Sequence, residues 1–170
     1  GADGQNALQL TDNEVPESSS CCGAGGARLS PDNEQVLFLA KANEGFEYYY
    51  KSSLFLVPAS GGEARLLLPD LPYELQAARW SENGDTIFLL ANMGVHSELF
   101  ELDLATEELR QLTDGKHSVR SWALEHSSGR HVLTIAQPDN PGDVWLLPVG
   151  KSEASPTQVT HVFDYLARDF

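Results

Sequence analysis

The sequence predicts an all-β fold built from repeated four-stranded antiparallel units, and three observations support this prediction. The stretch from Ala78 to Thr113 reads as four short strands joined by turns. Similar stretches recur at intervals of roughly 40–50 residues. The repeats close on similar short segments, which are Gln-Leu-Thr-Asp at 9–12 and 111–114 and Gln-Val-Thr-His at 158–161. A period of this length with four strands per repeat is typical of a β-propeller, so we expect a propeller segment.

The central repeat shows the strands and turns of the unit in order. Its first strand leads into a turn that holds Asn83-Gly84, a pair typical of tight turns because both residues tolerate a positive φ. The apolar run 87–90 follows as the second strand. Residues 99–104 alternate between apolar and polar side chains, as a strand with one solvated face does. A second turn then brings the chain back to Thr113, where the unit ends.

The other two repeats align with the central one. The segment ARLSPDNEQVLFLA at 27–40 matches ARWSENGDTIFLLA at 78–91. In the third repeat the alignment pairs four residues with Ala78, Gly84, Ile87 and Ala91, and these are Ala123, Gly129, Val132 and Ala136. The third strands recur as Leu54-Phe55, Leu99-Phe100 and Val144-Trp145. From these matches we expect three complete blades, at about 26–68, 76–113 and 119–160.

The two ends of the chain are expected to hold partial blades. Residues 1–11 end in the closing signature, so they are predicted to complete an earlier blade. Residues 12–26 are rich in Ser, Gly and acidic residues and have no periodicity, which indicates a loop between blades. The tail 161–170 matches no repeat and is expected to lead towards a following domain. The whole chain, 1–170, is then a single propeller segment.

Three blades are too few to close a ring, because closed propellers have about four to eight. We therefore expect an open array whose end blades expose apolar side chains. Exposed apolar patches of that kind mark interfaces or aggregation hazards. Either the chain is part of a longer propeller, or two copies associate through their open ends.

Charge and hydropathy exclude some kinds of partner. The formal net charge is −14, with 25 acidic and 11 basic residues, and such a surface repels the phosphates of nucleic acids. No apolar run reaches the roughly 20 residues that a membrane-spanning helix needs, so no membrane span is expected. The N-terminus shows no basic region followed by an apolar one, so no signal peptide is predicted in this chain. The cellular compartment is left open.

The sequence shows no arrangement of residues typical of catalysis, of metal binding or of cofactor binding. Cys21 and Cys22 are adjacent and are expected to be free thiols in a loop. The five histidines lack the spacing of helical zinc sites, and no Gly-x-Ser-x-Gly segment is present. Acidic pairs, such as Asp139 near Asp143, are expected to be solvated turn residues. We therefore assign no catalytic residue, no metal site and no cofactor.

One predicted loop, residues 41–53 between the second and third strands of the first blade, has a distinct composition. Its candidate contact residues are Glu44, Phe46, Glu47, Tyr48, Tyr49 and Tyr50. These side chains either cover a blade edge or form a contact with a substrate or a partner domain, since aromatic residues dominate interface energetics. Strand alternation places this loop and loop 12–26 on the same face. We expect function on that face, because long loops on a rigid scaffold carry most binding sites.

The repeats resemble those of a known family. The residues that carry the resemblance are Ser30-Pro31-Asp32 before an apolar strand, Leu54-Phe55 with Gly61-Gly62, and the Gln-Leu-Thr endings. They resemble the propeller repeats of prolyl-oligopeptidase-type serine peptidases, which include dipeptidyl and acylaminoacyl peptidases, and also those of the TolB propeller. Residues 91–100 resemble a bacterial branch of these peptidases. Residues 160–167 resemble the passage from the last blade into the hydrolase domain.

This resemblance implies a peptidase whose propeller limits the access of peptide substrates to a Ser-Asp-His site. That site would lie on a separate α/β-hydrolase domain of the same polypeptide, and none of its three residues is found in this chain. In the dipeptidyl branch, acidic residues on a propeller insertion anchor the N-terminus of the substrate. Glu44 and Glu47 lie in a comparable loop but do not match that acidic motif.

Two other functions remain open at this point. The chain could be a TolB-like propeller that binds proteins, or part of a propeller-based lyase or glycan-active enzyme with its site on the axis. A Gly-x-Ser-x-Gly domain downstream would favour the peptidase, and a histidine or metal cluster at the axis would favour the lyase. For the isolated chain we expect no peptidase activity.

Overall fold

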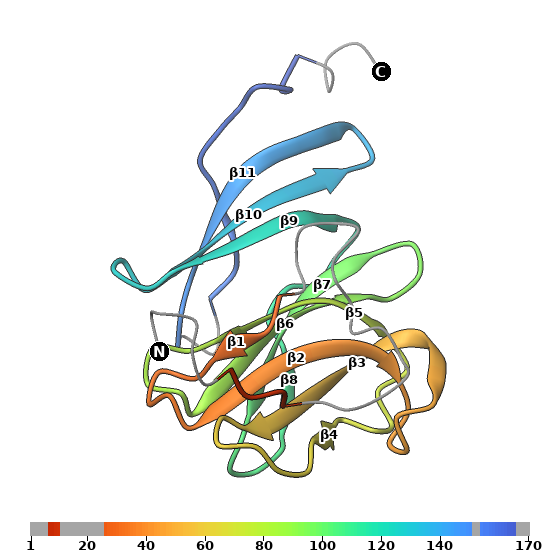
Figure 1. Cartoon of the computed structure of the whole chain (residues 1–170). Coiled ribbons are helices and arrows are strands. Elements are labelled where there is room, and N and C mark those ends of the chain that lie inside the picture. The colour runs from red at the N-terminus through yellow and green to blue at the C-terminus, as the bar shows by residue number, and fades with distance from the viewer. Residues whose placement is uncertain (1–6, 11–25, 151–153, 166–170) are drawn as a thin grey trace.

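The computed structural model describes residues 7–10, 26–150 and 154–165, and these form three four-stranded antiparallel sheets (Figure 1). Blade one contains β1 (Arg28–Leu29), β2 (Gln35–Ala42), β3 (Tyr48–Pro58) and β4 (Arg65–Leu67). Blade two contains β5 (Glu74–Trp80), β6 (Thr86–Asn92), β7 (Ser97–Asp103) and β8 (Leu109–Gln111). Blade three contains β9 (Ser118–Glu125), β10 (Arg130–Gln137), β11 (Asn140–Pro148) and β12 (Thr157–Gln158). No helix in these described ranges is long and apolar enough to cross a membrane.

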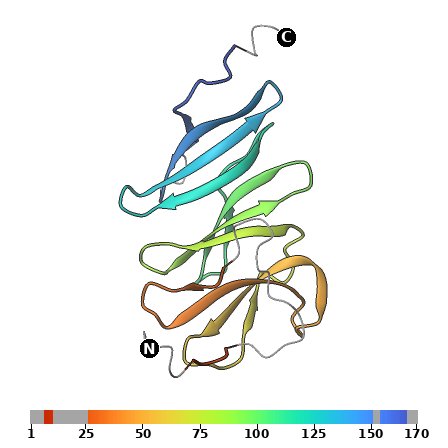
Figure 2. The same ribbon diagram turned by 45° about the horizontal axis from the view of Figure 1, so that its top comes forward.

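The three sheets stack one on the next in chain order, with blade two in the middle (Figures 1 and 2). Within each sheet the strands follow one another as a simple meander. The stack does not close on itself, so the described residues form an open segment of a propeller. The predicted fold class is confirmed.

Apolar side chains on both faces of blade two hold the stack together. Leu89 faces blade one, where it joins a buried cluster with Leu37 and Leu54. Its neighbour Leu90 faces blade three and joins a second cluster with Leu133. Successive side chains of a strand point to opposite faces, so one apolar run can serve both interfaces. Each fully buried leucine contributes about 1.5–3 kcal/mol.

The repeated turn between the first two strands explains why the sequences of these repeats align. In blade two, the Ser81 amide donates to the Thr86 carbonyl at 2.9 Å, and the Thr86 amide donates to Ser81 Oγ at 3.0 Å. Ser30 makes the same two contacts in blade one, at 2.8 and 2.9 Å. Both turns contain one residue with positive φ, Asn33 at 65° and Gly84 at 81°. Asn and Gly are the residues that tolerate this conformation best.

The sequence alignment of the third repeat is wrong by one residue on its second strand. It pairs Val132 with Ile87, but the residue that is buried against blade two is His131, which is fully buried. His131 lies two residues after the turn glycine Gly129, whereas Ile87 lies three residues after Gly84. A shift of one residue moves every side chain of a strand to the other face. The shorter turn therefore exchanges the faces, and Val132 points away from blade two.

The loop predicted at 41–53 is mostly strand. β2 continues to Ala42 and β3 begins at Tyr48, so the connection is the short turn 43–47. The turn is closed by the Asn43 amide, which donates to the Glu47 carbonyl at 3.0 Å. Tyrosines favour strands, so the aromatic run extends the sheet instead of leaving it.

The predicted partial blades at the ends stay predictions. Residues 7–10 form no strand, although Leu10 packs on the apolar cluster of blade one that includes Phe38 and Phe55. Of the predicted loop 12–26, all but Gly26 lies outside the described residues, and this includes Cys21 and Cys22. Its expected position on the same face as the aromatic residues is therefore not tested, and neither are the blade boundaries.

Candidate functional site

The six candidate residues come together on one hairpin, residues 43–51, which we call the aromatic hairpin. Tyr48 and Tyr50 are each 69% exposed. Tyr49 is half-buried, with its ring centroid 4.5 Å from that of Tyr50. The Lys51 ammonium lies 5.7 Å from the centroid of the Tyr49 ring, within the range of a cation–π contact. The outer side of the hairpin is therefore an aromatic surface open to solvent.

The turn of the aromatic hairpin is fixed by the other candidates. Phe46 adopts a positive φ of 56° and stacks on Phe55, with ring centroids 4.8 Å apart. Asn43 accepts a hydrogen bond from the Glu47 amide and donates one to the Glu47 carboxylate, both at 2.9 Å. Phe46 therefore packs into blade one and Glu47 holds the turn, while Glu44 is exposed. The Tyr49 hydroxyl, through its hydrogen bond with Tyr50, has a pKa raised above its usual value.

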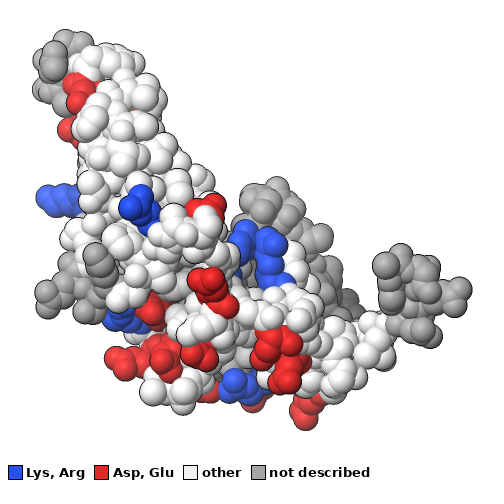
Figure 3. All heavy atoms as spheres, turned by 90° about the vertical axis from the view of Figure 1, so that its left-hand side faces the viewer, with Lys and Arg blue, Asp and Glu red and all other residues white. Residues whose placement is uncertain are grey.

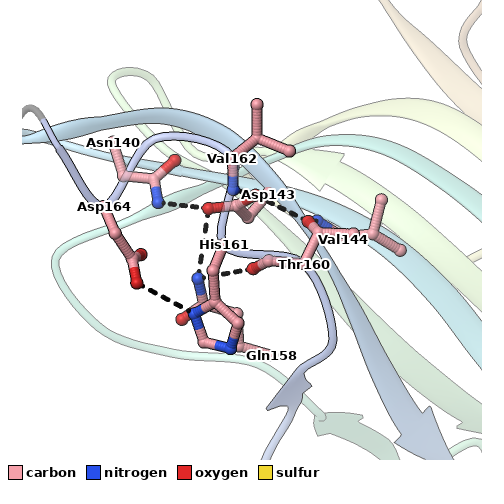
Figure 4. A network of polar contacts seen from close by, with 8 residues as sticks. All are labelled: Asn140, Asp143, Val144, Gln158, Thr160, His161, Val162 and Asp164. Atoms are coloured by element: carbon pink, nitrogen blue, oxygen red, sulfur yellow. Dashed lines mark hydrogen bonds and ion pairs between the residues drawn. The ribbon is translucent and has the colours of Figure 1, made fainter.

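A second group of polar residues was not predicted from the sequence, and it centres on Asp143 in β11 (Figure 4). Asp143 is 1% exposed, so the expectation of a solvated turn residue is wrong. Its carboxylate accepts from Thr160 Oγ1 at 2.6 Å and from the Val162 amide at 3.0 Å. Asn140 and Gln158 donate to the other oxygen, at 2.7 and 3.1 Å. The pKa of Asp143 is lowered to about 2, and the hydrogen bond from Thr160 contributes most to this shift.

Blade two contains the same arrangement at Glu98, which is 2% exposed. Thr113 Oγ1 donates to the Glu98 carboxylate and accepts from the Leu99 amide, just as Thr160 Oγ1 accepts from the Val144 amide. Burial raises the pKa of Glu98, and the contacts with Thr113 and His117 oppose that shift. In both blades a buried carboxylate holds the closing segment through the threonine of the Gln-x-Thr signature. We call the hydrogen bond from Thr113 to Glu98, and the one from Thr160 to Asp143, the carboxylate–threonine contact. Its role is structural.

The described residues contain no group of three or more His, Cys, Asp or Glu side chains placed to hold a metal ion.

No family model matches the chain. One curated protein does, dipeptidyl-peptidase 5 of Porphyromonas gingivalis, with 24% identity over 99 residues. The match covers 58% of this chain and 14% of that protein. This chain therefore spans a small part of the length of its curated relative.

Solved structures share the fold at low identity. TolB from Acinetobacter baumannii superposes with a TM-score of 0.61 and 15% identity, covering 82% of this chain and 33% of that one. The β-propeller domain of the Trilobed protease from Pyrococcus furiosus gives 0.61 and 14%, covering 78% and 37%. An acylaminoacyl peptidase of Pyrococcus horikoshii gives 0.60 and 17%, covering 81% and 20%.

These neighbours confirm the resemblance that the repeats indicate, and identities this low establish the fold alone. The chain is a segment of a β-propeller similar to those of prolyl-oligopeptidase-type serine peptidases and of TolB.

Proposed function

We propose that this chain is a noncatalytic propeller segment of a prolyl-oligopeptidase-type serine peptidase. In the intact protein it would limit access to the active site and dock a separate α/β-hydrolase domain of the same polypeptide. The sequence match to a dipeptidyl peptidase over 99 residues carries the proposal, and the structural matches to peptidases, which cover 78% and 81% of this chain, support it. The repeated turn and the carboxylate–threonine contact make the blades a rigid scaffold for such a role.

The aromatic hairpin is the proposed contact with the hydrolase domain or with a peptide substrate. Tyr48 and Tyr50 are exposed, yet they extend from a strand that is buried at Leu54 and Phe55. An aromatic side chain on a rigid strand loses little conformational entropy on binding, which is why such residues are common in interfaces.

A fluorophosphonate probe, which labels active-site serines, tests the proposed enzyme class. The natural gene product that contains this chain should be labelled and should be longer than 170 residues. The isolated 170-residue chain should not be labelled and should not cleave aminoacyl or peptidyl chromogenic substrates. A natural product that carries no reactive serine would contradict the proposal. It would favour the alternative of a protein-binding propeller with the fold that this chain shares with TolB.

The role of the aromatic hairpin is tested in the same natural product. Replacing Tyr48 and Tyr50 together by serine should leave folding intact, because both side chains are exposed. It should raise the KM for peptides, or weaken the association of separately expressed propeller and hydrolase parts, by about tenfold. The matched control is Val95→Ser, which changes an 87% exposed residue on the corresponding hairpin of blade two. An equal effect of both variants would assign no special role to the aromatic hairpin.

A further inference from the structure

A groove of about 360 Å³ lies on the opposite face from the aromatic hairpin, beside the turns that join the first and second strands. Its walls come from all three blades, although these residues are far apart in the sequence. The residues that matter here are Arg28, Leu29, Arg79, Trp80, Glu82 and His126. Most of them lie on the first strands β1 and β5, so the groove follows the edge where the blades meet.

Two arginines give this groove a positive charge in a strongly acidic protein. Arg28 and Arg79 occupy matching positions of their repeats, and Arg28 is exposed. Burial is the main cause that lowers the pKa of Arg79, and the nearby charge of Arg28 lowers it further. A bound anion would favour the charged form of both guanidinium groups. Figure 3 shows this face, where one group of Lys and Arg atoms lies beside a hollow, with Asp and Glu atoms below it, and other Lys and Arg atoms are scattered.

The groove is also structurally well defined. Trp80 Nε1 donates to the Arg28 carbonyl at 3.1 Å, which fastens β1 to β5. The Arg79 guanidinium donates to the Ala78 carbonyl at 2.8 Å and lies 5.9 Å from the centroid of the Trp122 ring. The half-exposed side chain of Leu29, with the Trp80 ring, provides an apolar wall. The guanidinium groups therefore lie next to an apolar surface, on strands that are hydrogen-bonded to one another through Trp80.

We propose that this groove binds a peptide through a carboxylate, with Arg28 and Arg79 holding the carboxylate and Leu29 and Trp80 packing against the adjoining apolar side chain. A guanidinium suits this role because it presents several N–H donors in the plane that a carboxylate matches. Glu82 would repel a second negative charge, so a peptide with one carboxylate fits best. The carboxylate can come from a free C-terminus or from an acidic side chain. The inference goes beyond the proposed peptidase role, because it concerns a groove lined by described residues of these three blades and no part of a catalytic domain.

The test is an NMR titration of the ¹⁵N-labelled 170-residue chain. The first probe is N-acetyl-leucyl-leucine, and its C-terminal amide is the neutral counterpart. We expect the acid to shift the Trp80 indole N–H and the amides of Leu29 and Ser81, and to bind about tenfold more tightly than the amide. A third probe, N-acetyl-aspartyl-leucinamide, carries its only carboxylate on a side chain and identifies which source of carboxylate the groove prefers.

Variants then assign the binding to the two arginines. Arg28→Gln changes an exposed residue, so it should fold normally and lose most of the difference between acid and amide. Arg79→Gln should do the same, and its ¹⁵N spectrum reports whether it is folded. The control is Arg130→Gln, which changes an exposed arginine in β10 that does not line the groove. This variant should bind as the unmodified chain does.

Three outcomes would overturn the proposal: equal binding of the acid and the amide, chemical shift changes that map elsewhere, or full binding by Arg28→Gln. Because no peptidase activity is measured, these outcomes are independent of the proposed enzyme class.

Discussion

At the scale of single residues, His131 is the clearest departure from the repeat. It occupies the position that Ile87 fills in blade two and is fully buried. Trp122 Nε1 donates to His131 Nδ1 at 3.1 Å, and the ring meets Phe88 edge-on at 4.6 Å. Burial lowers the pKa of His131 to about 4. The imidazole is therefore neutral in the folded protein, and its bond from Trp122 requires that Nδ1 be unprotonated.

This residue should make stability depend on pH in a defined window. The folded-state pKa of about 4 lies below the unfolded value of 6.5, so only the unfolded chain takes up a proton between these values. The free energy of unfolding should therefore fall as the pH drops from about 6.5 towards 4. At pH 5 the loss due to His131 should be about 2 kcal/mol. Urea denaturation at pH 7.5 and pH 5 measures it.

The matched comparison uses two histidine variants. His131→Ile restores the residue of the equivalent position and should remove this part of the pH dependence. His126→Gln changes an exposed histidine and should keep it. If the unmodified chain and His131→Ile lost equal stability at pH 5, the imidazole would not be buried as the structure has it.

The turn residue Gly84 gives a second prediction at this scale. Its φ is +81°, and a Cβ there would lie 3.4 Å from Pro31 Cδ. Gly84→Ala should reduce the free energy of unfolding by about 1–3 kcal/mol because of backbone strain. Asn33→Gly, at the matching turn with φ 65°, removes that strain and should be neutral or slightly stabilising. Urea denaturation of both variants checks the pair, and equal effects would contradict it.

Sequence patterns predict some of these residues and miss others. The Asn-Gly pair at 83–84 indicates a residue with positive φ because few other residues adopt it. The buried positions of His131, Asp143 and Glu98 could not be predicted, since polar residues are mostly exposed and only their neighbours in space explain the exceptions. The sequence contains one signal for the two buried carboxylates. The threonine of the Gln-x-Thr ending recurs, and Thr113 and Thr160 are the hydrogen-bond partners of Glu98 and Asp143.

At the scale of strands, turn length determines which residues face the core. Alternating patterns predict the strands themselves, and the three sheets agree with that prediction. The patterns do not determine the register, because a turn with one residue fewer exchanges the faces of β10. The same limit applies to the aromatic hairpin, where residues 48–53 continue β3 instead of forming a loop.

The carboxylate–threonine contact gives a prediction at this scale. Asp143→Asn removes the negative charge that accepts from Thr160, Gln158 and the Val162 amide. Hydrogen exchange at the Val162 amide should accelerate and the melting temperature should fall, while blade two is unaffected. Asp139→Asn, in the exposed turn of the same hairpin, should change neither. Because the folded pKa of Asp143 is about 2, this contribution should persist down to about pH 4 and be lost as the pH falls through 2.

At the scale of the whole molecule, the two end blades carry apolar side chains on their outward faces. Val132 and Leu146 are opposite each other in β10 and β11 and face away from blade two, and both remain partly exposed. On blade one, the apolar cluster with Phe38 and Phe55 faces away from blade two and is packed by Leu10. The number of repeats predicts these open ends, because each blade needs a neighbour on either face.

Light scattering of the purified chain tests the claim that it is an open segment of a larger propeller. The 170-residue chain should associate as its concentration rises, because no further blade of the described residues packs on its outward apolar faces. Leu146→Lys should reduce that association, and the natural gene product should show one defined mass. A 170-residue chain that stays monomeric at every concentration, with or without Leu146→Lys, would show that three blades suffice and would contradict the claim.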